Sequence, residues 1–309
     1  MSSLALLAGC EQGGTVDGKV AAARARNDGP AIWAVRDHDS VLYLFGTVHL
    51  LPGEMDWQRQ DMKDAFDAAG TIFFELDTDT AAQLEASILT QRLGFQESGK
   101  RLSDRLDSYQ LKLLEAASNN GAIPLASLDT MQPWLASEFL TISAAVKAGL
   151  SPDISADEAL KSRALRFRKN IVYLDTPERQ IRATADQPDF VQMVLLTESL
   201  EGFNSLGDNL RAIADAWSVG QTAQLTQKTT LALSSRSPEL YTSLIKDRNR
   251  DWASVFTRFM EGNETGFAAV GTAHLLGDDS VQEMLRDQGY EVSRFYAFQG
   301  ERVIKPVFE

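Results

Sequence analysis

Two histidines in this chain lie in nearly identical hexapeptides, which makes them the first candidates for chemistry. Residues 46–51 read GTVHLL and residues 271–276 read GTAHLL, so the hexapeptides that contain His49 and His274 are identical at five of six positions. A lone histidine is more often a half-buried residue with satisfied hydrogen bonds than a ligand. Two of only three histidines in a matched repeat favour a shared functional site. The third, His38, falls in the turn of an expected hairpin, where it would be exposed.

Glu75 is the natural third member of such a site. It follows the apolar run Thr71–Phe74, and a carboxylate at the end of a buried strand needs a partner because an unpaired buried charge is costly. Two histidines and a carboxylate suit a divalent ion with open positions for water and substrate. The same residues would also suit metal-free acid–base chemistry, with a histidine as base and Glu75 orienting it. Alternatively, Glu75 caps the next helix or pairs with an arginine.

The elements around the motifs predict how these residues meet. Each motif follows an apolar strand and precedes a helix that leads into another strand. The fold class is therefore α/β, with a mixed, partly parallel sheet built from two related strand–GTxHLL–helix–strand halves. A large helical insertion, about residues 80–262, separates the halves. In such sheets ligands bind where strands end and helices begin, which is where both histidines fall.

The composition sets the limits of this interpretation. The chain has 309 residues, 44% hydrophobic and 24% charged, which is typical of a globular protein with a sizeable core. Its net charge of −13 argues against nucleic acid as a partner. No apolar run reaches about 18 residues, so we expect no membrane-spanning segment. We expect residues 1–30 to be a signal remnant and flexible lead-in, and residues 31–309 to form a single domain.

The one cysteine, Cys10, ends the sequence Leu-Ala-Gly-Cys, which resembles the lipobox of bacterial lipoproteins. We therefore expect an exported bacterial protein that is periplasmic or is anchored to a membrane as a lipoprotein by Cys10. A complete secretory signal would need a longer apolar stretch and a positively charged start, so the true start lies upstream or the likeness is accidental. The membrane contact expected for this chain is limited to that anchor.

The order of landmarks along residues 31–308 resembles the GumN, TraB and Tiki proteins. They are the hairpin Trp33 to Phe45 leading into GTVHLLP, Phe74–Asp77, Gln132-Pro133-Trp134, Leu174-Asp175-Thr176 with Gln180, Arg248-Asn249 with Trp252, and VGTAHLLG. The resemblance implies a duplicated α/β core, also likened to erythromycin esterases. It further implies metal-dependent peptidase activity using His49, Glu75 and His274, with a divalent ion such as manganese, cobalt or zinc. Arg248 and Asn249 correspond to the family's polar pair near the site, where they would bind substrate. Asp175 stands where the family is expected to have a glutamate.

Three functions remain open from the sequence. The first is a metal-dependent hydrolase, in particular a peptidase, and the second is a metal-free esterase-like hydrolase. The third is a non-catalytic peptide-binding or regulatory protein. The expected partner is a peptide or small-molecule substrate. In each case we expect Trp134, Trp252 and the inserted helices to form the wall of the cleft.

Overall fold

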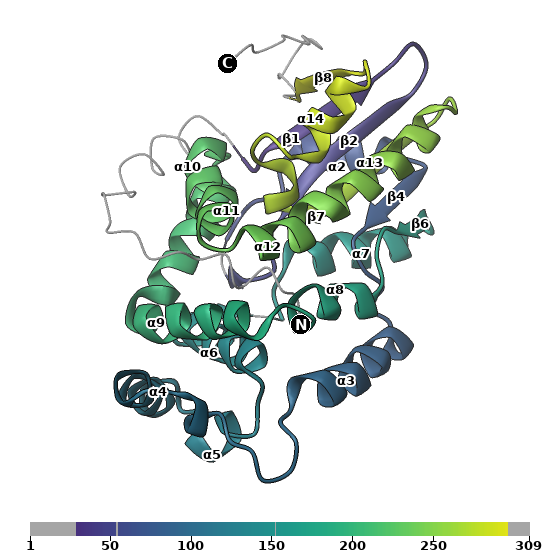
Figure 1. The fold of residues 1–309 in the computed structure, drawn as a ribbon. Coiled ribbons are helices and arrows are strands. Elements are labelled where there is room, and N and C mark those ends of the chain that lie inside the picture. Colours follow the sequence, from purple (N-terminus) through teal and green to yellow (C-terminus); the bar gives the residue numbers. More distant parts are fainter. Residues whose placement is uncertain (1–28, 54, 152, 296–309) are drawn as a thin grey trace.

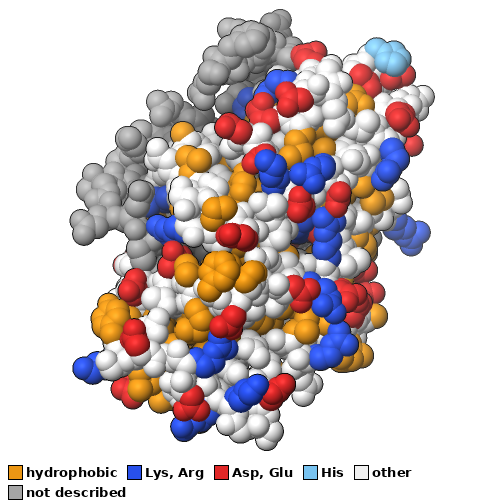
Figure 2. All heavy atoms as spheres, in the orientation of Figure 1, with side chains coloured by type: hydrophobic (Ala, Val, Ile, Leu, Met, Phe, Trp, Pro, Cys, Tyr) orange, Lys and Arg blue, Asp and Glu red, His pale blue; other side chains and the backbone are white. Residues whose placement is uncertain are grey.

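The computed structural model describes residues 29–295, apart from residues 54 and 152. Cys10, the lead-in and residues 296–309 lie outside the described residues. Within the described part, no helix is both long and apolar enough to cross a membrane. Figure 2 shows acidic and basic side chains intermixed over one face, with apolar patches between them.

A six-stranded sheet forms the core of the α/β part, in the order β6-β4-β7-β2-β1-β8 (Figure 1). Neighbouring strands are parallel from β6 through β2, whereas β1 is antiparallel to both of its neighbours. A partly parallel sheet was predicted, because each motif-bearing half needs a crossover helix, and this prediction is confirmed. The strands are β1 (Ile32–Arg36), β2 (Val41–Thr47), β4 (Thr71–Phe74), β6 (Asn170–Tyr173), β7 (Thr265–Gly271) and β8 (Glu291–Arg294).

The two related halves interlock at the centre of this sheet. The first runs β2–motif–α2–β4 and the second runs β7–motif–α14–β8, and β7 inserts between β2 and β4. Because β2 and β7 are parallel, with Gly46 opposite Val270 and Thr47 opposite Gly271, both motifs begin at the same sheet edge. Glu75 leaves β4 at that edge too, beside β7.

Helices cover both faces of the sheet. Helix α2 (Gln60–Ala68) packs Met62 and Phe66 against apolar side chains of one face, including Phe267. Helices α13 (Asp247–Met260) and α14 (Val281–Asp287) bury Phe256 and Leu285 against the other face, with Leu44 and Ala268. Alternate strand residues therefore face two separate apolar layers.

The segment between β4 and β7 is mostly helical and includes strand β6. Its lower layer in Figure 1 is a second apolar cluster, built chiefly by α6 on α9 with α3 and α4 beside them. The remaining elements are β3 (Leu51–Pro52), α3 (Thr80–Gly94), η2 (Ser103–Arg105), α4 (Ser108–Gly121), α5 (Leu125–Leu128), α6 (Pro133–Lys147), β5 (Leu150–Ser151), α7 (Ala156–Arg166), α8 (Pro177–Ala185), α9 (Asp189–Ser218), α10 (Thr222–Thr226), η3 (Gln227–Leu231), α11 (Ala232–Arg236), α12 (Pro238–Tyr241), η4 (Thr242–Lys246) and η5 (Thr272–Leu275).

Candidate functional site

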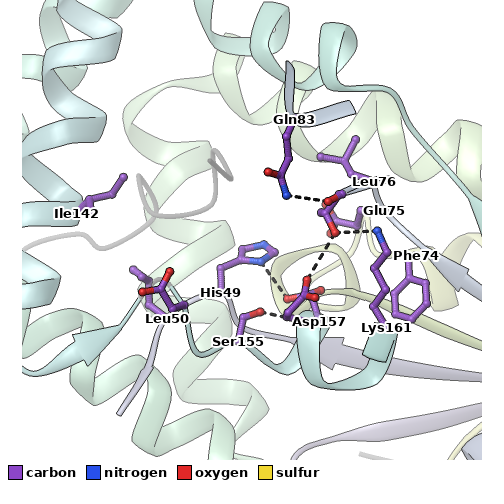
Figure 3. Close-up of a pocket in the computed structure, with 13 residues that line it drawn as sticks. His49, Leu50, Phe74, Glu75, Leu76, Gln83, Ile142, Ser155, Asp157 and Lys161 are labelled. Carbon is purple, nitrogen blue, oxygen red and sulfur yellow. Dashed lines mark hydrogen bonds and ion pairs between the residues drawn. The ribbon is translucent and has the colours of Figure 1, made fainter. Parts of the chain in front are cut away.

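A pocket of about 420 Å³ opens at the sheet edge where the first motif ends (Figure 3). Its lining combines the first motif, the end of β4 and three inserted helices: His49, Leu50, Phe74, Glu75, Leu76, Thr78, Gln83, Ile142, Asp153, Ser155, Asp157, Glu158 and Lys161. Helices α3, α6 and α7 contribute Gln83, Ile142 and Asp157, so the insertion does form part of the wall. The expectation that Trp134 and Trp252 line the cleft is wrong, since neither is in the pocket lining. The indole nitrogen of Trp134 donates to the Leu93 carbonyl in the helical cluster.

His49 lies in this pocket against a carboxylate that the motifs gave no reason to expect. Its Nδ1 is 2.9 Å from Asp157 Oδ2, and Thr47 Oγ1 donates to Asp157 Oδ1 at 2.6 Å. Asp157 is placed by the start of α7, where Ser155 caps the helix by accepting a hydrogen bond from the Glu158 amide. The facing carboxylate favours a proton on Nδ1, so that the lone pair of the neutral ring is on Nε2. That Nε2 is buried and has no hydrogen-bond partner in the described part of the chain.

Charge around the first histidine favours its protonated form. Burial lowers the pKa of His49, but the carboxylates of Asp157 and Glu75 outweigh burial, so the pKa lies above the usual value. Burial raises the pKa of Asp157, and the nearby His49 more than reverses this, so the pKa is lowered and the carboxylate is ionised at neutral pH.

His274 has a different environment, because it is fully buried and is not among the residues that line the pocket. Its Nδ1 lies 2.6 Å from Asn249 Oδ1, while the Asn249 amide nitrogen donates to the carbonyls of His274 and Asp279. These carbonyls fix the orientation of the amide, so the Nδ1 of His274 must carry the proton. The Trp252 ring packs against the imidazole at 4.3 Å between centroids.

Arg248 connects the second histidine to Glu75. Its Nη1 donates to His274 Nε2 at 3.2 Å and its Nη2 to Glu75 Oε2 at 3.0 Å. Burial and the guanidinium of Arg248 lower the pKa of His274 to about 3, which keeps the ring neutral. Burial raises the pKa of Glu75, but Arg248 and both histidines reverse this, so Glu75 is ionised. Its other oxygen, Oε1, accepts from the Gly271 amide at the start of the second motif.

The structure thus brings Glu75 beside each of the two histidines, in different ways. Glu75 Oε1 is 3.8 Å from His274 Nε2, and Glu75 shares the pocket lining with His49. Arg248 and Asn249 are 1% and 0% exposed and contact protein groups; neither is part of the pocket lining. Asp175 accepts from Arg248 Nε at 2.7 Å, which gives the carboxylate at this position a role as a buried counterion.

The residues as placed do not fit a three-ligand ion site. Among the described residues, His49, Glu75 and His274 do not each offer a ligand atom within 4.8 Å of the other two. Nε2 of His274 already accepts a hydrogen bond from the Arg248 guanidinium. Nε2 of His49 has no hydrogen-bond partner among the described residues. Of the three residues, His49 and Glu75 line the pocket and His274 does not. The described residues do group ligand atoms at Asp37, His38 and Asp39, which are exposed on the β1–β2 turn.

Sequence reasoning missed Asp157 as the partner of His49. It lies 108 residues beyond that histidine (157 − 49), and the visible signal was only the helix start marked by Ser155 and Glu158. Lys161, one turn along α7, was also missed. It lies in the pocket lining and donates to Asp77 and Thr78 at 2.9 and 2.7 Å.

Interlocked halves that bring both copies of a duplicated motif to one edge of a mixed sheet define an α/β protein. The chain belongs to the TraB/PrgY/gumN family, whose model matches residues 31–294. A comparison with curated proteins finds no match.

Proposed function

We propose that this protein is a hydrolase of peptides or other small acyl compounds, with His49 as its reactive group. The observation that carries the proposal is the His49 imidazole itself. Its Nδ1 contacts the Asp157 carboxylate, and its buried Nε2 has no hydrogen-bond partner among the described residues that surround the pocket. A buried nitrogen without a partner is costly, by about 1–3 kcal/mol, and a catalytic role is one physical reason for keeping it at a pocket.

The side chains support a simple course of reaction. His49 Nε2 accepts a proton from water as the water oxygen forms a bond to the scissile carbonyl carbon. Asp157 and Glu75 stabilise the imidazolium so produced. The same proton is then given to the leaving amine or alcohol as its bond to carbon breaks. Lys161, the one Lys or Arg in the described pocket lining, supplies positive charge for the carbonyl oxygen.

A divalent ion, which the resemblance implies, would be held by His49 and Glu75. Bound there, it would polarise the carbonyl and lower the pKa of a bound water. Asp157 fits such a role for His49, because histidine ligands commonly place their second nitrogen against a carboxylate.

The test is a digest of a mixed synthetic peptide library by the full chain in ¹⁸O-water, followed by mass spectrometry. We expect cleavage with one ¹⁸O in each new carboxylate, abolished in His49→Gln and retained in His38→Gln, a matched change at an exposed histidine. Parallel digests with EDTA, and with added Mn²⁺, Co²⁺ or Zn²⁺, show whether an ion takes part. Saturable peptide binding without cleavage would overturn the hydrolase and favour a binding protein.

We further propose that Cys10 carries lipid and that the protein acts outside the cytoplasm. The support is the Leu-Ala-Gly-Cys sequence. Mass spectrometry of the native N-terminus should find an acylated Cys10, and a free Cys10 thiol in host membranes would contradict this.

A further inference from the structure

Arg248 occupies the position between Glu75 and His274 that a shared ion would need. Its three guanidinium nitrogens donate to Glu75, Asp175 and His274, and Nη1 also lies 3.3 Å from the Leu244 carbonyl. The guanidinium stacks over Trp252 at 4.7 Å, and the side chain is almost fully buried. Arginine suits this place because its planar fork can serve two carboxylates and a third acceptor at once.

The second histidine is held as an acceptor for that arginine. Asn249 Oδ1 accepts a hydrogen bond from the protonated Nδ1, so the lone pair is on Nε2 and points at Arg248 Nη1. An ion ligated by this lone pair would have to displace the guanidinium, and would then stand beside a buried positive charge. The first histidine has no such competitor in the described chain, since its Nε2 has no partner.

We infer that His274 is not an ion ligand, and that His274, Asn249 and Arg248 form a buried unit that positions Glu75 beside His49. Arg248 Nη2 donates to Glu75 Oε2, and the Gly271 amide donates to Oε1. Both carboxylate oxygens are therefore fixed, one by helix α13 and the other by the second motif. The duplicated motif therefore has two tasks: the first copy presents a reactive histidine, and the second holds the carboxylate that faces it. The positioning of Glu75 rests on the proposed function, whereas the ligand state of His274 can be measured without turnover.

The chain offers a clean test because it has only three histidines. Long-range ¹H–¹⁵N spectra of the full chain should resolve three imidazoles, assigned by His38→Gln, His49→Gln and His274→Gln. We expect His274 to show a protonated Nδ1 and an unprotonated Nε2. During titration with ZnCl₂, the signals of His274 should stay unchanged. The signals of His49 should either shift, if zinc binds there, or stay unchanged as well. A zinc-dependent shift of His274 Nε2 together with His49 would overturn the inference.

Calorimetric titration with ZnCl₂ and MnCl₂ gives an independent answer. Glutamine at position 274 keeps an oxygen acceptor near the place of Nε2 but is a poor ligand, so any ion affinity should change less than about twofold in His274→Gln. His49→Gln should lose at least about tenfold, in line with the loss of a ligand contact. Equal losses in the two variants would overturn the inference. If the wild type binds neither ion, that result supports it.

Positioning is tested separately from mere packing. In Arg248→Lys, one ammonium cannot serve both carboxylates, so kcat should fall at least about tenfold with KM changed less than about threefold. His274→Gln should keep kcat within about threefold of wild type. A loss in KM alone for Arg248→Lys would contradict the positioning of Glu75.

Discussion

The two copies of GTxHLL share five letters and an equivalent place in the fold, yet their histidines have opposite surroundings. His49 keeps 22% of its side chain exposed, pairs with Asp157 and has a raised pKa. His274 is fully buried, contacts Arg248 and has a pKa near 3. Both motifs begin at neighbouring positions of parallel strands, so the strands cannot be the cause. The difference arises from the helices that cover each copy, α7 over the first and α13 over the second.

This contrast shows that a repeat specifies backbone placement more strongly than side-chain role. Each copy carries its histidine to the same sheet edge, and the insertion then supplies an anion to one and a cation to the other. The following changes either remove that asymmetry or measure its size.

The largest effect should come from removing the cation of the second site. Arg248→Met leaves Glu75 and Asp175 as buried charges without their shared partner. We expect a loss of about 3–5 kcal/mol in the free energy of unfolding, measured by urea denaturation. Arg250→Met, two residues along the same helix, changes an exposed arginine and should cost less than about 1 kcal/mol. Equal losses in the two variants would show that the buried network adds no stability.

Removing the anion of the first site should affect activity more than folding. In Asp157→Asn, hydrolysis should fall by about 10²-fold, near the lower end of general acid–base contributions. Asp157 raises the pKa of His49, so its loss should lower that pKa. A base must be deprotonated, and the acidic limb of the kcat/KM profile should therefore move to lower pH. A limb that stays in place, or moves to higher pH, would exclude His49 as the titrating base.

A smaller effect should come from the point where the two motifs touch. Gly46 lies inside β2, and a Cβ there would come within 3.1 Å of the Thr272 backbone. The glycine thus permits close approach of the second copy, and Gly46→Ala should cost about 1–3 kcal/mol by overpacking. Gly70→Ala, where the nearest neighbouring atom is 3.9 Å away, is the matched control. Thermal unfolding of both variants decides this, and a neutral Gly46→Ala would remove the contact from the account.

A further test varies the pH. Because the folded-state pKa of His274 is lowered to about 3, the unfolded chain binds a proton at this residue that the native chain excludes. Stability from this residue is complete above about pH 6.5 and is lost as pH falls towards 3, at up to about 1.4 kcal/mol per pH unit. Denaturation of wild type and His274→Gln at several pH values should show a shallower decline in the variant. Parallel slopes would mean that His274 titrates normally.

The sequence predicted the framework of this site but not its inner contacts. Apolar runs and the repeat were enough to predict the strands, the parallel centre and the arrival of Glu75 at the motif edge, because these follow from local periodicity. The partner of His49 is on α7, more than a hundred residues later in the sequence. The partners of His274 are on α13, about 25 residues earlier. Nothing local marks Asp157 as facing His49, since a carboxylate in a first helical turn usually serves only the helix dipole. Trp134 was expected in the cleft but packs at the end of α3. No local pattern in the sequence marks this distant partner either.

The most direct test of the division between the two copies is the kcat of His49→Gln beside that of His274→Gln, on a peptide that the wild type cleaves. We predict that His49→Gln loses about 10³-fold, as expected for a general base. His274→Gln, still accepting from Arg248, should stay within about threefold of wild type, and both variants should remain folded by circular dichroism. Equal and non-additive losses in the two single variants and the double variant would contradict this account, because they would show both histidines acting as one catalytic unit.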